Sequence, residues 1–344
     1  ASITRILKQS INLRLPLKLL ADGVLQGDRM MLSQAITIIE SNLADDRKLS
    51  TRLLDKIIHA TGKSIRIGIT GVPGVGKSSF IEVLGQHITN LGKKLAVLTV
   101  DPSSQITRGS ILGDKTRMEG LSKQLLAYIR PSPSGSILGG VSQKTNDVML
   151  LCEAAGFEVI IIETVGVGQS EITVKNLVDF FLLLMLAGAG DELQGIKKGI
   201  TEVAHAIVIT KADGDNMKNA RAAKATYEQA LHLSSASTAT WNPRVITTSA
   251  LTKAGIDDVW KMIMLFKEQS IANNTFEHNR TVQNNNWLQI SFHELLISDV
   301  NRFDVLQNEK KKLEMKLREK KISASAAAEK LVKAYHKAIR EGNE

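Results

Sequence analysis

The octapeptide Gly71-Val72-Pro73-Gly74-Val75-Gly76-Lys77-Ser78 constrains the fold of this chain more than any other segment. It fits the pattern G-x-x-x-x-G-K-S/T, in which glycines let backbone N–H groups turn around phosphate oxygens at a helix N-terminus. Residues 64–70 have the composition of a buried strand, and residues 79–84 open a helix. A chance Gly-rich turn would lack that strand and that helix, so we interpret the segment as a nucleoside-triphosphate P-loop.

Each residue type in this loop has a chemical role. Lys77 can reach the β- and γ-phosphates of a nucleotide, so we also expect it to take part in catalysis, and the Ser78 hydroxyl can ligate Mg²⁺. The residues predicted to bind the nucleotide through this loop are Gly71, Gly74, Val75, Gly76, Lys77, Ser78 and Ser79.

Strand-like and helix-like segments alternate from residue 64 to about residue 270. This alternation predicts an α/β fold, a P-loop NTPase with a mostly parallel sheet covered by helices on both faces. We expect further strands at 94–100, 157–163, 178–186, 205–210 and 244–249, and helices at 145–155, 216–231, 255–269, 287–303 and 323–341. The most apolar run, 180–186, is too short to span a membrane and predicts a buried strand.

Three domains are expected along the chain. Residues 1–62 carry apolar residues at helical spacing and predict a helical N-terminal extension. The P-loop domain is expected at 63–272, and a helical extension that dimerises is expected at 273–344. Thr275–Asn286 is polar and predicts a linker or exposed loop. An apolar stripe is expected to dock on the core or to pair with a second subunit; it consists of Phe303, Leu306, Leu313 and Leu317.

Composition argues against several classes of protein. An apolar content of 43% is typical of a globular chain, and the one cysteine, Cys152, permits no disulfide within the chain. No secretory or transit segment is predicted at the start, so we expect a cytoplasmic protein without membrane association. The net charge is +9, and residues 301–344 hold 12 Lys or Arg against 7 Asp or Glu. Both signs alternate there and aromatic residues are only 4%, so nucleic-acid binding is not expected.

Polar residues follow two further predicted strands. Asp101 ends one strand, where it can hold Mg²⁺ or its water, although an Asx turn before Pro102 is an equally good interpretation. Glu163 ends another strand and can stand where an Asp usually holds the metal. The N–H of Gly166 can bond the γ-phosphate and so sense hydrolysis, which makes Glu163 and Gly166 catalytic candidates. Gln169 is a weaker candidate for positioning the attacking water.

The later motifs favour guanine over adenine. Residues 210–213 read Thr-Lys-Ala-Asp, close to the Asn-Lys-x-Asp box whose Asp accepts hydrogen bonds from the guanine N1–H and N2 amine. Adenine lacks those donors, and a site rejects an analogue that leaves its polar groups unpaired. Thr210 replaces the Asn, which is expected to weaken the preference. The residues predicted to contact the base are Thr210, Lys211, Asp213, Ser249, Ala250 and Leu251.

Together these motifs resemble the chaperone-type P-loop GTPases of the SIMIBI class, and within them the MeaB/ArgK group, whose human relative is the MMAA protein. The resemblance reaches from the N-terminal helices to about residue 300, and it is carried by the segments 71–79, 101–104, 112–118, 130–135, 163–171 and 188–199. It implies GTP hydrolysis with Mg²⁺, a homodimer, and a chaperone role for an adenosylcobalamin-dependent acyl-CoA mutase, usually methylmalonyl-CoA mutase.

The resemblance also implies roles for single residues. It implies Mg²⁺ contacts from Ser78, Asp101, Asp114 and Glu163. It implies that an extra switch meets the mutase, with candidates Gly188, Asp191, Glu192, Gln194, Lys197 and Lys198. That segment also follows a buried strand at the edge where P-loop sites lie, although a plain surface loop is the alternative. Ala187 stands where the family usually has Pro, which is expected to loosen this switch.

Two other functions compete with this interpretation. A metal-insertion GTPase needs His- or Cys-rich tracts, and the 7 scattered His and one Cys argue against it. The second is an accessory ATPase or kinase of a lysine, arginine and ornithine transport system, an older label of the same family. The Asp213 box argues against ATP, so this function is kept as the alternative.

Overall fold

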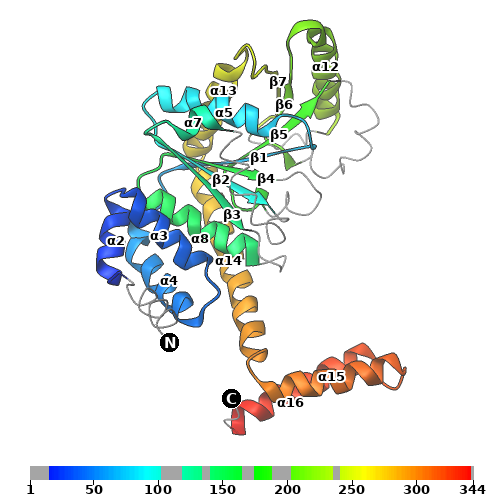
Figure 1. The fold of residues 1–344 in the computed structure, drawn as a ribbon. Helices are drawn as coiled ribbons and strands as arrows, with labels where there is room; N and C mark the ends of the chain where they lie inside the picture. Colours follow the sequence, from blue (N-terminus) through cyan, green and yellow to red (C-terminus); the bar gives the residue numbers. More distant parts are fainter. Residues whose placement is uncertain are drawn as a thin grey trace, which may run out of the picture. The chain divides into compact units, whose positions relative to one another are not determined.

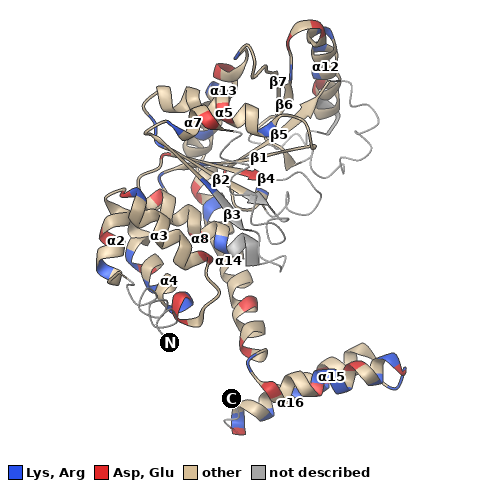
Figure 2. Cartoon of the chain, in the orientation of Figure 1, with Lys and Arg blue, Asp and Glu red and all other residues tan. Residues whose placement is uncertain are grey.

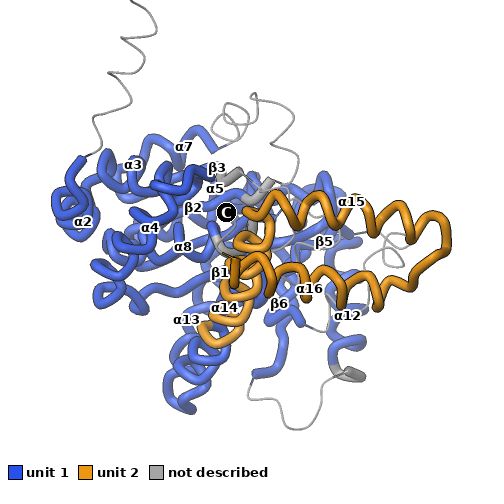
Figure 3. The backbone as a smooth tube through the Cα atoms, turned by 90° about the horizontal axis from the view of Figure 1, so that it is seen from below, with its two compact units in different colours: residues 1–283 blue, residues 284–344 orange. Residues whose placement is uncertain are grey.

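The computed structural model describes residues 15–101, 118–133, 140–164, 174–187, 203–234 and 241–341. The chain divides into two compact units, Ala1–Gln283 and Asn284–Glu344, which are coloured separately in Figure 3. Each unit is described by itself. The predicted division at 62/63 and 272/273 stays a prediction.

The described part of the first unit contains a sheet of seven parallel strands in the order β3-β2-β4-β1-β5-β6-β7 (Figure 1). The strands are β1 (Ile65–Gly71), β2 (Leu95–Asp101), β3 (Ala127–Pro133), β4 (Val159–Thr164), β5 (Phe180–Leu186), β6 (Ala206–Thr210) and β7 (Arg244–Thr247). Every residue of β1 is buried, and so is every residue of β5 but its last. Strands buried along their length are typical of a parallel sheet covered on both faces, and the predicted α/β fold is confirmed.

The order of the strands reverses at β1. Ile67 lies opposite Ile161 of β4 on one side and opposite Phe180 of β5 on the other. Strands β2 to β4 lie on the first side of β1, and β5 to β7 lie on the second. In open α/β sheets the crevice at the carboxyl ends of the strands, at such a reversal, is where ligands bind. The topology therefore favours the loop after β1 as a binding site.

Helices cover both faces of the sheet (Figure 1). On one face lie α5 (Lys77–Asn90), α7 (Glu119–Ser122) and α13 (Ile256–Ala272), whose apolar side chains share a core with β1. On the other face lie α8 (Gly140–Ala154) and the N-terminal helices α2 (Leu17–Leu25), α3 (Arg29–Glu40) and α4 (Ala44–Ile57). Helix α12 (Met217–Ser234) packs beside β6 and β7. The described chain also contains two short 3₁₀ helices, η1 (Ile58–Ala60) and η2 (Gly214–Asn216).

The predicted N-terminal helices are confirmed, and polar contacts tie them to the sheet. Arg130 of β3 forms a 2.6 Å ion pair with Glu40 at the end of α3. Lys144 of α8 donates to the Glu40 carbonyl oxygen at 2.7 Å. Arg29 donates to the carbonyl oxygens of Leu125 and Ala127. The N-terminal helices are therefore fixed against the β3 side of the first unit.

The predicted linker at Thr275–Asn286 is wrong, because these residues lie in the long helix α14 (Thr275–Val300). The Asn273 side chain accepts from the Thr275 backbone N–H at 3.1 Å and so caps the helix start. Phe276 and Arg280 lie one turn apart, and both are buried. Polar composition concealed this helix because one of its buried positions is an arginine.

Strand β3 is absent from the strands expected from sequence. It contains Pro131 and Pro133, which argue against a strand when the sequence is taken alone. In the described sheet β3 is one of two edge strands and pairs only with β2, so a missing N–H on its open side costs no ladder hydrogen bond. Prolines therefore fit this position.

The second unit contains the end of α14, with α15 (Asp304–Arg318) and α16 (Ala324–Glu341). The predicted apolar stripe packs inside this unit: Leu306 and Leu313 are buried as α15 lies against α16, and Phe303 meets Tyr335 edge to face at 5.8 Å. Figure 2 shows both signs of charge along α15 and α16. Among the residues described in the two units, no helix is long and apolar enough to cross a membrane.

Candidate nucleotide-binding site

The backbone between β1 and α5 has the form that the P-loop sequence predicts. Strand β1 ends at Gly71 and α5 begins at Lys77. Gly76 caps α5 with φ of 91°, a left-handed conformation that L side chains rarely adopt. At Gly71 a Cβ atom would lie 2.5 Å from the Leu184 carbonyl oxygen, so only glycine lets β1 and β5 approach this closely. These two glycines are required by geometry, in addition to any role with a ligand.

Lys77 folds back over the loop that it follows. Its Nζ donates to the carbonyl oxygens of Gly71 at 2.8 Å and Val72 at 3.3 Å. Both acceptors are neutral, so a phosphate oxygen would be a stronger partner for the ammonium group. The position suits a cation that changes its partner when a nucleotide enters.

Two of the proposed metal ligands, Ser78 in the first turn of α5 and Glu163 on β4, are in contact. The Ser78 hydroxyl donates to Glu163 Oε1 at 3.4 Å, and Glu163 is half-buried near the end of β4. A hydroxyl and a carboxylate are hard oxygen donors of the kind that Mg²⁺ takes together with nucleotide phosphates, so these residues fit the ion. The backbone of Asp101 ends β2, but its side chain lies outside the described residues. Asp114 lies outside them as well.

Other predicted site residues fall in segments outside the described residues. They are Gly166, Gln169 and the whole predicted partner switch at 188–198. Their roles stay predictions. Ala187, directly before the switch, is the last described residue after β5.

On the base side, the loops after β6 and β7 are joined by hydrogen bonds. The Ser249 hydroxyl donates to Asp213 Oδ2 and accepts from the Thr252 N–H at 3.1 Å. The Ala212 N–H donates to the Thr248 carbonyl oxygen at 2.9 Å. One carboxylate oxygen of Asp213 is therefore held by Ser249, and Asp213 itself is only half-buried. The predicted base contacts Ala250 and Leu251 follow in the same loop, where Leu251 is 83% exposed.

The base side and the phosphate side are in direct contact. Thr210 Oγ1 donates to the Val75 carbonyl oxygen at 2.7 Å and lies 3.2 Å from that of Met185. Lys211 Nζ donates to the Gly74 carbonyl oxygen at 2.9 Å. Both predicted motifs therefore meet in one site at the carboxyl ends of β1 and β6. Each motif had a role of its own in the sequence, but no signal there indicated the bonds between them.

A second feature that sequence reasoning missed is a buried pair of hydroxyls. Thr164 Oγ1, at the end of β4, donates to Thr70 Oγ1, near the end of β1, at 2.8 Å. Both side chains are fully buried. The pair ties the strand that carries Glu163 to the strand that carries the P-loop. A Thr at the end of each apolar strand was the only available signal.

A third missed feature is a buried ionic cluster at the opposite, amino end of β1. Arg66 donates to both carboxylate oxygens of Glu153 at 2.9 and 3.0 Å. Arg280 donates to both oxygens of Asp179 at 2.7 Å and to Glu153 at 3.2 Å. Burial opposes ionisation of Glu153, but the charges and hydrogen bonds of Arg66 and Arg280 outweigh it and lower its pKa to about 2. These four residues are hereafter the ionic cluster.

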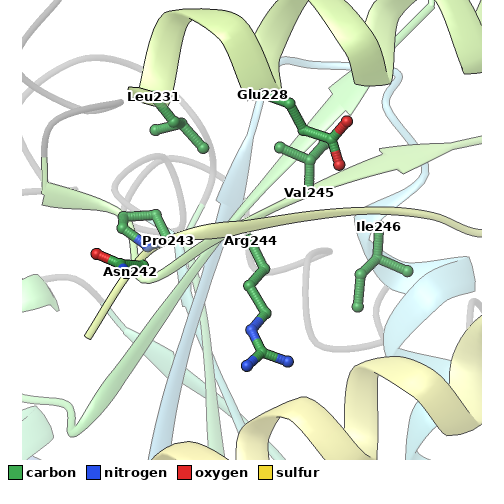
Figure 4. Close-up of a pocket in the computed structure, with 7 residues that line it drawn as sticks. All are labelled: Glu228, Leu231, Asn242, Pro243, Arg244, Val245 and Ile246. Carbon is green, nitrogen blue, oxygen red and sulfur yellow. The ribbon is translucent and has the colours of Figure 1, made fainter. Parts of the chain in front are cut away.

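A surface hollow of about 590 Å³ lies between α12 and β7 (Figure 4). Its lining residues are Glu228, Leu231, Asn242, Pro243, Arg244, Val245 and Ile246. It lies at the sheet edge, two strands beyond β5 and away from the P-loop on β1. We assign it no ligand.

Comparison with known proteins agrees with these features. A family model described as "Methylmalonyl Co-A mutase-associated GTPase MeaB" matches residues 32–304. The chain is 51% identical over 264 residues to the GTPase ArgK of Escherichia coli, a match that covers 77% of this chain and 80% of that protein. It is 41% identical over 323 residues to the mitochondrial methylmalonic aciduria type A homolog of Mus musculus, covering 91% of this chain and 78% of that protein.

One solved structure is similar in both sequence and fold. It is the crystal structure of an LAO/AO transport system kinase, with a TM-score of 0.73 and 38% sequence identity. The match covers 93% of this chain and 97% of that one. The similarity therefore extends beyond the P-loop domain to nearly the whole chain.

Proposed function

The chain belongs to the MeaB family of methylmalonyl-CoA mutase-associated GTPases and is a GTP hydrolase. From this premise we propose that it gates cofactor delivery to an adenosylcobalamin-dependent acyl-CoA mutase and protects that mutase. Methylmalonyl-CoA mutase is the proposed client, supported by the description of the family and by the name of the mouse relative. The observation that most strongly supports the assignment of a nucleotide-binding site is that the side chains of residues 210 and 211 donate hydrogen bonds directly to the P-loop.

The proposed hydrolysis uses the carboxyl end of the sheet. The loop N–H groups and Lys77 bind the β- and γ-phosphate oxygens and offset the charge that grows on them as water attacks the γ-phosphorus and GDP departs. Ser78 and Glu163, with Asp101 and Asp114, would hold Mg²⁺, and the ion would neutralise phosphate charge. We propose that hydrolysis is slow without a partner, because no arginine finger or well-placed Gln was evident in the sequence beside Gly166.

Base selection is proposed to lie with Asp213. Ser249 holds one oxygen of its carboxylate, which leaves the other to accept from the guanine N1–H and N2 amine. ATP should therefore fail to displace labelled GDP. Asp213→Asn should let xanthine nucleotides compete, since the amide can donate where the carboxylate accepted. Equal displacement of GDP by ATP and GTP would contradict the guanine assignment.

A homodimer is proposed on a different observation. Within the second unit, α14 carries exposed apolar side chains at helical spacing: Leu288 at 65%, Phe292 at 55% and Leu295 at 65% exposure. Contiguous exposed apolar residues of this kind mark interaction sites on soluble proteins. We further propose the cytoplasm as its location, in keeping with a free, buried thiol at Cys152.

The alternative is an accessory kinase of a transport system, and its support is the similar crystal structure, which is that of an LAO/AO transport system kinase. A kinase would move the γ-phosphate of a nucleotide to a protein acceptor, whereas a GTPase releases it as orthophosphate. Transfer of labelled γ-phosphate to a protein, with ATP preferred over GTP, would favour the alternative.

The test of the mutase proposal measures orthophosphate release from GTP with and without purified methylmalonyl-CoA mutase. The parent should be stimulated. An Asp191→Ala/Lys198→Ala double variant should keep its basal rate and lose the stimulation, because the partner no longer orders the switch. The matched control is Asp257→Ala/Lys261→Ala, which removes an exposed ion pair of 2.6 Å on α13 and should be stimulated like the parent.

Two results would count against the proposal. If the mutase stimulates the double variant as strongly as the parent, residues 188–198 are a plain connection. If no acyl-CoA mutase stimulates the parent while GTP hydrolysis is measurable, the proposed client is wrong.

A further inference from the structure

The hydroxyl of Thr210 lies inside the proposed nucleotide site, yet it is bonded to the protein backbone. The side chain is buried, with Oγ1 2.7 Å from the Val75 carbonyl oxygen and 3.2 Å from the Met185 carbonyl oxygen. A hydroxyl carries one proton, and both neighbours are acceptors, so the proton is committed to them and chiefly to Val75. We propose that Thr210 is a positioning residue for the phosphate cradle, and that it does not read the base.

The bond to Val75 orients one peptide of the P-loop. In a trans peptide the C=O of one residue and the N–H of the next point to opposite sides. A Thr210 that holds the Val75 carbonyl therefore directs the Gly76 N–H away from β6. Gly76 caps α5, and its own carbonyl accepts from the Phe80 N–H at 2.9 Å. Its N–H thus belongs to the helix N-terminus that binds anions.

The next residue makes a second link of the same kind. Lys211 Nζ donates to the Gly74 carbonyl oxygen, and the Lys211 backbone has φ of 54°. A non-glycine residue keeps that conformation only where its surroundings hold it. Two successive residues at the end of β6 therefore hold two successive carbonyls of the P-loop. Thr210 is the buried member of this pair.

This arrangement separates phosphate binding from base selection. Asp213 and Ser249 bond to each other, whereas the Thr210 hydroxyl bonds to the Val75 and Met185 carbonyls. Removing the Thr210 hydroxyl should therefore weaken every phosphate ligand by one common factor. Removing the Asp213 charge should instead change the ratio between bases. The inference rests on the nucleotide site proposed above.

The experiment compares three ligands by isothermal titration calorimetry with Mg²⁺: GDP, inosine diphosphate, which lacks the N2 amine, and inorganic tripolyphosphate. Thr210→Val keeps the shape of the side chain and removes its hydroxyl. We expect it to weaken all three ligands by about 3- to 10-fold, the scale of one hydrogen bond. The ratio of GDP to inosine diphosphate affinity should stay within about twofold of the parent, and Thr210→Ser should restore binding.

The matched control is Asp213→Asn, which should change the base ratio and leave tripolyphosphate binding unaltered. The inference is overturned if Thr210→Val weakens GDP alone, shifts the base ratio, or leaves all three affinities unchanged. If Asp213→Asn leaves the ratio unaltered while Thr210→Val behaves as expected, the proposed base reader fails and the inference stands. Should Thr210→Val fail to fold, Thr210→Cys, with a weaker donor, takes the same three measurements.

Discussion

The two ends of β1 use polar groups in opposite ways. At the carboxyl end, Lys77 is bonded to neutral carbonyls and Ser78 makes a long 3.4 Å contact with Glu163. At the amino end, Arg66 and Arg280 are sealed against two carboxylates. The first arrangement can change partners when a charged ligand arrives, while the second has no room for one. The comparison teaches that the buried ion pairs and the proposed ligand-binding site lie at opposite ends of the same strand.

The same contrast predicts different consequences of mutation. When one member of a buried ion pair is removed, the other charge stays buried without a partner, and this lowers the stability of the fold. The carbonyl groups that Lys77 contacts carry no charge, so its removal leaves no uncompensated charge on them. We therefore expect substitutions at the amino end to affect folding and substitutions at the carboxyl end to affect the nucleotide.

The largest effect is expected from Glu153→Gln in the ionic cluster. The substitution leaves Arg66 and Arg280 buried with one carboxylate between them, and should lower the free energy of unfolding by about 3–5 kcal/mol in urea denaturation. The control is Glu158→Gln, directly before β4, whose exposed 3.1 Å pair with Lys93 should contribute less than about 1 kcal/mol. Equal losses in both variants would show that burial adds nothing to the stabilising effect of the ionic cluster.

Next comes Lys77→Ala at the carboxyl end. It should lower kcat/KM for GTP by roughly 100- to 1000-fold, since it removes a donor to the charge that develops on the phosphates. The unfolding free energy should change by less than about 1 kcal/mol, because its partners in the loop are carbonyls. Orthophosphate release and urea denaturation measure the two quantities. Normal GTP hydrolysis by this variant would contradict the proposed role of Lys77 in the nucleotide site.

Acid should remove the stability that the ionised Glu153 carboxylate contributes. Its folded pKa of about 2 lies below its ordinary value of 4.5, so its contribution is complete above pH 4.5 and is lost as pH falls toward 2. The deficit of Glu153→Gln relative to the parent should shrink by up to about 3 kcal/mol across that window. Denaturation curves of both proteins at each pH give the deficit. A deficit that stays constant down to about pH 2.5 would mean that the carboxylate is not held ionised.

The smallest effect is expected at the hydroxyl pair of Thr70 and Thr164. Either Thr→Val substitution alone leaves one buried hydroxyl without this partner and should cost about 1–2 kcal/mol. The double substitution should cost less than the sum of the two, with a coupling of about 1 kcal/mol in a double-mutant cycle. Strict additivity would show that the 2.8 Å contact contributes nothing to stability.

Much of this fold could be predicted because its signals are local. The P-loop octapeptide, the apolar run of β5 and the alternation of strands and helices each follow from neighbouring residues. The ionic cluster could not be predicted in that way. Its members come from β1, α8, the residue before β5, and α14, and only the folded chain brings them together. Arg280 even counted against the correct structure, because it made the start of α14 resemble a polar linker.

The site was predictable as a set of motifs but not as a network. Asp213 and Ser249 were both predicted to contact the base, yet the bond between them depends on how the loops after β6 and β7 meet. Thr210 was interpreted as a weakened base reader by analogy with Asn. Its position against the Val75 carbonyl gives it a different proposed role, and no spacing rule in the sequence contains that information.

The central claim is that the carboxyl end of β1 binds guanine nucleotide while the amino end only holds the fold. The direct test is the rise in unfolding free energy caused by GDP and Mg²⁺ in the parent, Lys77→Ala and Glu153→Gln. The account predicts a rise of about 2.7 kcal/mol at a hundredfold excess over Kd in the parent, a similar rise in Glu153→Gln from a lower baseline, and little or none in Lys77→Ala or with ADP. A full rise in Lys77→Ala, or an equal rise with ADP in the parent, would contradict it.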